Sequence, residues 1–210
     1  MRRLCGLSLI CFLVLAGCAK QPTAPAVEVE EPEVVAEWLE TSPEMMTATQ
    51  RAQQELVLAA TGALVSELMG ELMASLEAGD PSAAIGVCKD KAPAVAANVS
   101  GQYGLTLGRT SNKLRNPANT APHWAMEYVD GLVDTPTYVV GPNGELGALL
   151  PIKLVAECQM CHGPADMIDD EIKTAIAEYY PDDQAVGFVE GDLRGWFWVE
   201  APPGDADVAM

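Results

Sequence analysis

Cys158-Gln159-Met160-Cys161-His162 is the stretch around which the rest of the chain is organised. Two cysteines separated by two residues and followed directly by a histidine form the attachment signature of c-type haem. The two thiols can form thioethers at one edge of the porphyrin, and the next residue places an imidazole under the iron. One turn of helix can do both, because the three side chains are close in sequence. The motif predicts one covalent haem c with His162 as an axial ligand.

Two other kinds of site share parts of this pattern. A Cys-x-x-Cys pair can be a thioredoxin-like redox pair, but that motif belongs near a β-α-β pattern, which we do not find. It can also be part of a structural zinc site, which needs four ligands. Cys88, Cys158, Cys161 and one of the two histidines could supply them. Zinc is the weaker alternative, because Cys88 has no Cys-x-x-Cys partner of its own.

The first residues have the features of an export signal. Arg2 and Arg3 precede an apolar segment, 4–15, that is too short to span a bilayer comfortably. Small residues directly before Cys18 resemble the bacterial lipoprotein signal, in which the cysteine is lipidated and becomes the new N-terminus. The alternative is an ordinary signal peptide with a chance cysteine. We expect residues 1–17 to be removed and Cys18 to anchor the protein to a membrane.

Export is compatible with the haem, because bacteria assemble covalent haem c outside the cytoplasm. The expected location is therefore the bacterial cell envelope, on the periplasmic side. Residues 18–42 are rich in Pro and Glu and predict a mobile acidic tether. Residues 43–200 suit one haem domain, and residues 201–210 a disordered tail. The net charge of −18 argues against nucleic acid and anionic membrane surfaces as partners and favours solubility or docking to a basic partner.

Helix signals dominate the first half of the domain. The capping pattern at 42–44 and apolar residues spaced by four predict a long amphipathic helix that ends near Gly79. Residues 80–82 start a second helix, which Pro93 ends or restarts. Methionines in the long helix, such as Met69, are more often core residues than iron ligands.

Cys88, in the second helix, is the only cysteine of the expected domain outside the haem motif. Nearby Lys89 and Lys91 would lower the pKa of its thiol. A thiolate can be an axial ligand of haem iron, so Cys88 is either the distal ligand or an inert buried cysteine. His123, at the expected start of a short helix, is a rival distal ligand. A surface or packing role is more common for such a histidine.

A polar segment follows an expected strand at 105–110 and contains two arginines. Haem carries two propionates, and arginine binds carboxylates in a bidentate manner. Arg109 and Arg115 are therefore candidate propionate ligands. The alternative is that they form salt bridges with the many carboxylates of the chain.

Strand signals dominate the second half of the domain. Residues 138–140 and 146–150 flank a Gly-Pro-Asn-Gly turn and predict a hairpin. We expect a helix over 169–180 and a last hairpin between 186–189 and 193–199. The predicted fold is α+β, with long N-terminal helices packed on a small antiparallel sheet and the haem helix inserted before the last hairpin.

Several motifs of the chain together resemble those of one family. They are Ala84-Ile85-Gly86-Val87-Cys88 with Ala92-Pro93, Arg109-Thr110-Ser111 with Arg115-Asn116-Pro117-Ala118-Asn119, Cys158 to Gly163, and Gly191-Asp192-Leu193-Arg194-Gly195. They are similar to the mono-haem c-type cytochrome domain that has a PAS-like fold and His/Cys iron ligation. That family occurs as stand-alone exported proteins and as the sensory domain of membrane-bound signalling proteins.

The resemblance covers roughly residues 50 to 200. It implies that Cys158 and Cys161 carry the thioethers, that His162 is the proximal ligand, and that Cys88 is the distal ligand. His123 departs from the family pattern. The chain shows no kinase or other output domain.

Two functions are expected from these features. The first is electron transfer at low reduction potential, since a thiolate ligand favours ferric iron. The second is redox or gas sensing, with the haem as the switch and a partner protein as the output. An enzyme is the least expected function, because peroxidase or oxygenase chemistry would need one of two axial ligands to leave. The partner would be an unknown redox or signalling protein.

Overall fold

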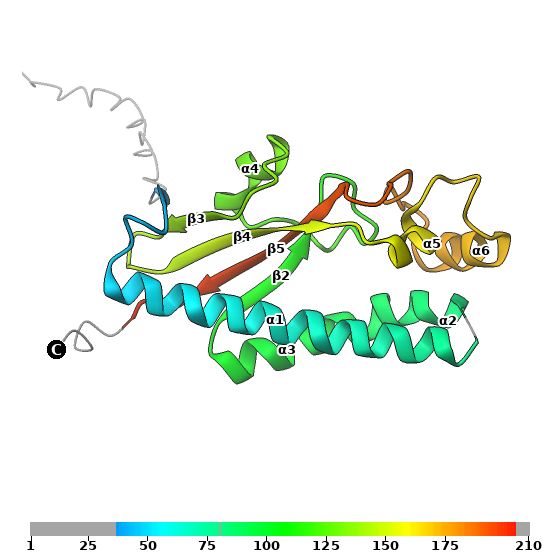
Figure 1. The fold of residues 1–210 in the computed structure, drawn as a ribbon, viewed down its shortest axis with the longest axis horizontal. Helices are drawn as coiled ribbons and strands as arrows, with labels where there is room; N and C mark the ends of the chain where they lie inside the picture. Colours follow the sequence, from blue (N-terminus) through cyan, green and yellow to red (C-terminus); the bar gives the residue numbers. More distant parts are fainter. Residues whose placement is uncertain (1–36, 80, 205–210) are drawn as a thin grey trace, which may run out of the picture. The chain divides into compact units, whose positions relative to one another are not determined.

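The computed structural model describes residues 37–79 and 81–204. The predicted signal peptide, Cys18 and most of the predicted tether and tail lie outside these residues. The described chain forms a five-stranded antiparallel sheet with helices packed against it (Figure 1). The predicted α+β class is therefore confirmed.

The sheet has the strand order β1-β3-β4-β5-β2. Its strands are β1 (Leu39–Thr41), β2 (Thr106–Thr110), β3 (Thr137–Val140), β4 (Leu146–Lys153) and β5 (Leu193–Ala201). The predicted hairpin of β3 and β4 is confirmed, with Tyr138 opposite Ala148. β5 pairs with β4 on one side and with β2 on the other, so it lies inside the sheet.

The predicted last hairpin is wrong. Residues 186–189 form no strand, because their backbone hydrogen bonds go elsewhere. The amide of Gly187 donates to the carbonyl of Gly163, and the amide of Phe188 donates to the carbonyl of His162. This segment therefore fastens the haem motif, and the motif lies between β4 and β5 rather than ahead of a hairpin.

The folded domain begins before the expected boundary at residue 43. β1, which falls within the predicted tether, pairs with β3 at the sheet edge. Trp38 stacks on Trp124, with ring centroids 5.5 Å apart. This aromatic contact ties the start of the domain to the sheet face that carries Trp196.

The long helix α1 spans Ala48–Glu77. Its predicted start at 42–44 is wrong, because Thr47 and Gln50 form a reciprocal capping box at the true start. Its predicted end near Gly79 is confirmed. Pro93 lies in the first turn of a new helix, α3, which agrees with one of the two predicted alternatives for this proline. The other helices are α2 (Pro81–Gly86), the π-helical η1 (Val87–Lys91), α3 (Ala92–Tyr103), η2 (His123–Ala125), α4 (Met126–Asp130), η3 (Ala156–Cys158), α5 (Gln159–His162) and α6 (Asp170–Tyr179).

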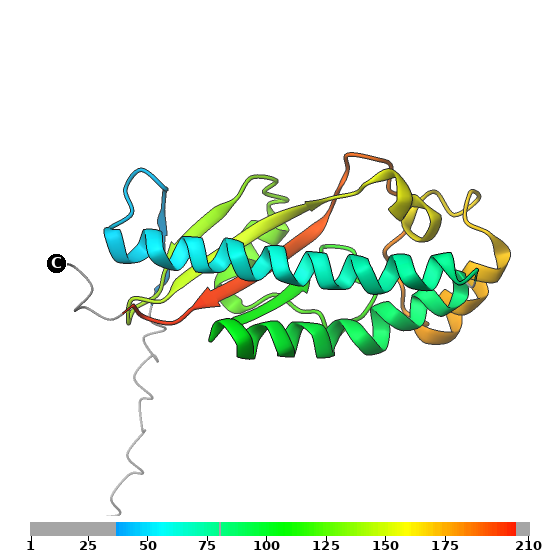
Figure 2. The same ribbon diagram turned by 60° about the horizontal axis from the view of Figure 1, so that its bottom comes forward.

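The two faces of the sheet carry different helices. α1 and α3 cover one face, and η2 and α4 lie on the other (Figures 1 and 2). The alternation along β5 decides which aromatic side chain faces which helix. Trp196 and Trp198 pack toward Trp124, whereas Phe197 packs on the α1 side.

The haem motif lies beyond the end of β4. α5 and α6 sit there beside α2, near the C-terminal end of α1 (Figures 1 and 2). An apolar cluster joins α2 to α6 through Ile85, Ile172 and Ile176, and Cys161 packs against it. This packing brings the π-helical turn that follows α2 close to the haem motif.

Candidate functional site

A cavity of about 380 Å³ lies where α1, η1, the haem motif and the ends of β2, β4 and β5 meet. Its volume is within the range of small-molecule and cofactor sites. Most of its wall is apolar, with Leu68 and Leu72 from α1, Ile152 from β4 and Phe197 from β5. Polar side chains also line it, and they include five residues singled out from the sequence: Cys88, Arg109, Arg115, Cys158 and His162.

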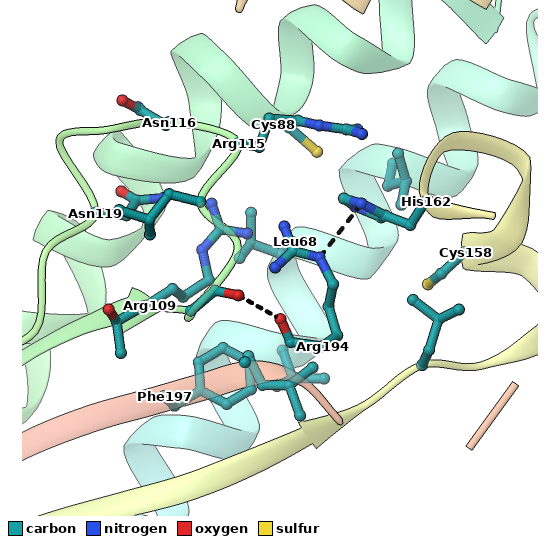
Figure 3. Close-up of a pocket in the computed structure, with 18 of the residues that line it drawn as sticks. Leu68, Cys88, Arg109, Arg115, Asn116, Asn119, Cys158, His162, Arg194 and Phe197 are labelled. Carbon is teal, nitrogen blue, oxygen red and sulfur yellow. Dashed lines mark hydrogen bonds between the residues drawn. The ribbon is translucent and has the colours of Figure 1, made fainter. Parts of the chain in front are cut away.

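His162 lines this cavity and has a defined tautomer. Its Nδ1 lies 2.7 Å from the carbonyl oxygen of Ala185. Nε of Arg194 lies 3.3 Å from the same nitrogen (Figure 3). Nδ1 cannot both donate and accept, and the shorter contact is to an oxygen that can only accept. We therefore assign the hydrogen to Nδ1, which leaves Nε2 with its lone pair free.

The electrostatic surroundings keep this imidazole neutral. Burial lowers the pKa of His162 well below its ordinary value, and the charges of Arg115 and Arg194 lower it further. A neutral imidazole with a bonded Nδ1–H and a free Nε2 is the form that ligates metals. The arrangement therefore suits an axial ligand of iron.

The two motif cysteines have different surroundings. Cys158 lines the cavity, whereas Cys161 is packed against the apolar cluster beside α6. Burial raises the pKa of both thiols, that of Cys161 to about 11. The charge of Arg115 acts in the opposite sense and lowers the pKa of Cys161, but burial outweighs it.

Cys88 reaches the cavity from η1 (Figure 3). A π-helical turn of this kind is rare and often occurs at functional sites. Its two lysine neighbours have other partners: Lys89 lies over the ring of Tyr179, and Lys91 pairs with Glu71. The fold thus brings Cys88, Cys158 and His162 to one cavity from separate segments of the chain.

The two predicted arginines differ. Arg115 is buried and forms an ion pair with Asp183, Nε to Oδ1 at 3.1 Å, so the salt-bridge alternative holds for it. Arg109 also lines the cavity, but its guanidinium makes no hydrogen bond or ion pair with the residues that the structure describes. Arg109 is thus free to bind an anion.

Arg194 was not singled out as a site residue from the sequence, although it stands in one of the quoted motifs. A register shift between β4 and β5 pairs Ile152 with Gly195 and Lys153 with Leu193, which leaves Arg194 in a bulge. Bulges often re-aim a side chain beside an active site. Arg194 turns into the cavity, where burial and the charge of Arg115 lower its pKa to about 10. The Gly-x-x-x-Gly spacing around it was the available signal.

His123 does not reach the cavity. It is exposed at the start of η2, on the sheet face opposite α1, so the fold offers it no route to this site. The zinc alternative also lacks support. Within 37–79 and 81–204, no group of three or more His, Cys, Asp or Glu side chains is placed to hold a metal ion.

Comparisons with known proteins agree with one another. A family model described as Tll0287-like (Tll0287) matches residues 24–202. A solved structure titled "Crystal structure of the cyanobacterial heme-protein Tll0287" is similar, with a TM-score of 0.53 and 26% sequence identity. The similarity covers 78% of this chain and 97% of that one. No curated protein matches the chain.

Proposed function

The chain belongs to the Tll0287-like family, and from this premise we propose that it is a redox-active protein with one covalent haem c in the cavity. The observation that carries the proposal is the hydrogen bond from His162 Nδ1 to the carbonyl of Ala185, at 2.7 Å. It leaves the other ring nitrogen free to ligate iron at an apolar cavity. The similar solved chain is titled a heme-protein, which supports the same cofactor.

Cys158 and Cys161 would carry the thioethers. Cys158 lines the cavity, and Cys161, three residues further along the chain, packs against the apolar cluster beside α6. Haem attached in this way supplies the one-electron chemistry of iron. The chain itself limits the access of water with its apolar walls and holds the imidazole of His162 by Nδ1.

Cys88 would be the distal ligand. Its position on η1, at the same cavity as His162, supports ligation by these two side chains (Figure 3). A thiolate donates electron density and favours ferric iron. We therefore expect a low reduction potential and electron transfer as the activity.

The ion pair of Arg115 changes the expected propionate ligands. Because Arg115 is committed to Asp183, the proposal assigns the propionates to Arg109 and Arg194. Both guanidinium groups belong to cavity-lining residues, and neither forms an ion pair with a carboxylate of the described residues.

Sequence alone supports the location of the protein. Residues 1–17 would be removed, and Cys18 would be lipidated and would anchor the domain on the periplasmic side of the bacterial cell envelope. The PAS-like fold implied by the resemblance is part of the same proposal. A sheet whose C-terminal strand β5 lies between β4 and β2 is compatible with it.

Sensing through a partner protein is the second candidate, and η1 is the observation that favours it. A π-helical turn can relax to α-helical register, which would withdraw Cys88 from the cavity. Because η1 joins α2 directly to α3, such a change would move both helices. A haem that ignores CO and NO, in a protein whose fold is unchanged on reduction, would exclude sensing. Slow exchange with every small redox protein of the compartment would exclude electron transfer.

The first test is expression with haem c maturation, followed by optical spectra of both redox states and a pyridine haemochrome assay. We expect a c-type haemochrome and a low-spin ferric spectrum of thiolate character. A colourless protein, or haem that organic solvent extracts, would contradict the proposal. His162→Ala should abolish the low-spin spectrum, whereas the matched variant His123→Ala, on the other sheet face, should leave it unchanged.

The second test concerns the distal ligand. A redox titration of Cys88→Ala should give a higher reduction potential than wild type, because the electron-donating sulfur is lost. Met69 lines the same cavity and provides the control, since Met69→Leu should keep the thiolate spectrum. An unchanged potential in Cys88→Ala would show that Cys88 is not the ligand.

A further inference from the structure

The carbonyl oxygen of Ala185 serves two donors. It accepts the Nδ1 hydrogen of His162 at 2.7 Å, and it also accepts from Nη2 of Arg115 at 3.3 Å. The same Nη2 donates to the carbonyl of Cys161 at 2.6 Å. One guanidinium therefore contacts both the backbone of the haem motif and the acceptor that orients its histidine.

Asp183 holds that guanidinium in place. Its two oxygens accept from Nε and Nη2 of Arg115, each at 3.1 Å. Oδ1 of Asp183 also accepts a hydrogen bond from the amide of Ala185 at 2.9 Å. The carboxylate therefore contacts the same residue whose carbonyl accepts from His162. The side chains of Arg115 and Asp183 are only 8% and 7% exposed, so water screens their charges weakly.

Hydrogen bonds behind a ligating histidine tune the metal as well as orient the ring. A strong acceptor at Nδ1 gives the imidazole more anionic character and favours ferric iron. A cationic donor on the same carbonyl competes for its lone pairs and weakens it as an acceptor. The effect is large at low local dielectric.

We propose that Arg115 and Asp183 are positioning residues that set the hydrogen bond behind His162 and thereby tune the reduction potential of the haem. The inference rests on the proposed function, in which His162 ligates iron. It assigns this buried pair a role that neither propionate binding nor a simple structural salt bridge would have. The two charges act in opposite senses, so removing one or the other should shift the potential in opposite directions.

The experiment uses the full-length, haem-matured protein and potentiometric titration. Arg115→Gln removes the positive charge and leaves the carboxylate, so the potential should fall below that of wild type. Asp183→Asn keeps an acceptor for the Ala185 amide and leaves the guanidinium uncompensated, so the potential should rise. The matched control is the exposed pair of Lys173 and Asp170 on α6, neither of which lines the cavity, and its Lys173→Gln and Asp170→Asn variants should leave the potential unchanged.

A second measurement keeps the test decisive if Arg115→Gln fails to fold. Arg115→Lys keeps the positive charge but loses the planar guanidinium, which bonds to Asp183 and to the carbonyls of Cys161 and Ala185 at once. It should change the g-anisotropy of the low-spin ferric signal in electron paramagnetic resonance, which reports the imidazole's anionic character.

The two proposals can fail separately. If the wild type carries haem ligated by His162, and Arg115→Gln and Asp183→Asn shift the potential in the same direction or not at all, the pair only stabilises the fold and this inference is wrong. A wild-type protein without covalent haem would overturn the proposed function, and this inference with it.

Discussion

Gly195→Ala tests whether the close approach of β5 to β2 shapes the site. A Cβ on Gly195 would lie 2.3 Å from the carbonyl oxygen of Thr110 and 3.1 Å from the Cβ of Ser111. The backbone of Gly195 also has φ +158°, a conformation that side chains rarely adopt. The strands would have to separate, because a backbone oxygen cannot rotate away.

The cost follows from these two effects. Overpacking costs about 1–3 kcal/mol, and a side chain in a glycine-only conformation costs about 1–3 kcal/mol. We expect Gly195→Ala to lower the free energy of unfolding by about 2–6 kcal/mol, a large part of the total for a single domain. At about 2–4 °C per kcal/mol, a loss of 3 kcal/mol lowers the Tm by about 6–12 °C.

The assay is guanidinium unfolding followed by far-UV circular dichroism, with the midpoint and slope compared with wild type. Gly101→Ala is the matched control: it lies in α3 with open space around a new Cβ, so it should be neutral or gain about 0.5–1 kcal/mol. Gly195 also holds Arg194 in the bulge, so the variant should change the haem spectrum. A Gly195→Ala protein as stable as Gly101→Ala would refute the reasoning.

Three further predictions concern protein that is expressed without haem attachment, and the last of them concerns its surface. The pKa of Cys161, raised to about 11, should make its alkylation by iodoacetamide at pH 8 about 100-fold slower in the native protein than in urea, because each pKa unit is a factor of about ten. Mass spectrometry of the peptides gives the two rates, and equal rates would contradict the burial. His162 resists protonation in the native state, so stability should fall as the pH drops below the ordinary pKa of 6.5. His162→Gln should remove that part of the pH dependence in urea titrations, and an unaltered profile would contradict it. Lys153→Gln, which breaks the exposed pair with Asp134, should leave the midpoint of the same titration almost unchanged because water screens the two charges, and a clear loss would contradict that screening.

Much of the local structure could be predicted from the sequence. The hairpin of β3 and β4 has its turn residues between two apolar runs, and α6 has its own end signals. The capping box of Thr47 and Gln50 can also be read from the sequence, but the proline pattern at 42–44 predicts an earlier start of α1 instead. Each of these features depends on residues that are close in the chain.

The candidate site was predictable only in part. Cys158, Cys161 and His162 form a contiguous motif, so the sequence alone predicts haem attachment and ligation by them. The position of Cys88 beside them came from a resemblance, and its neighbouring lysines proved to have other partners. Arg194 escaped notice because the Gly-x-x-x-Gly spacing around it does not show that a register shift between β4 and β5 turns its side chain into the cavity.

By itself, the sequence of this protein determined most of the helices, the turn between β3 and β4, and the contiguous Cys158-to-His162 motif. Those properties follow from backbone conformation and from spacing over a few residues. Tertiary structure alone decided that β5 pairs with β2 and β4, that residues 186–189 fasten the haem motif, and that Arg115 binds Asp183 rather than facing the cavity alone. These contacts join segments far apart in the chain, and they form because each buried backbone or charged group must find a partner once the core excludes water.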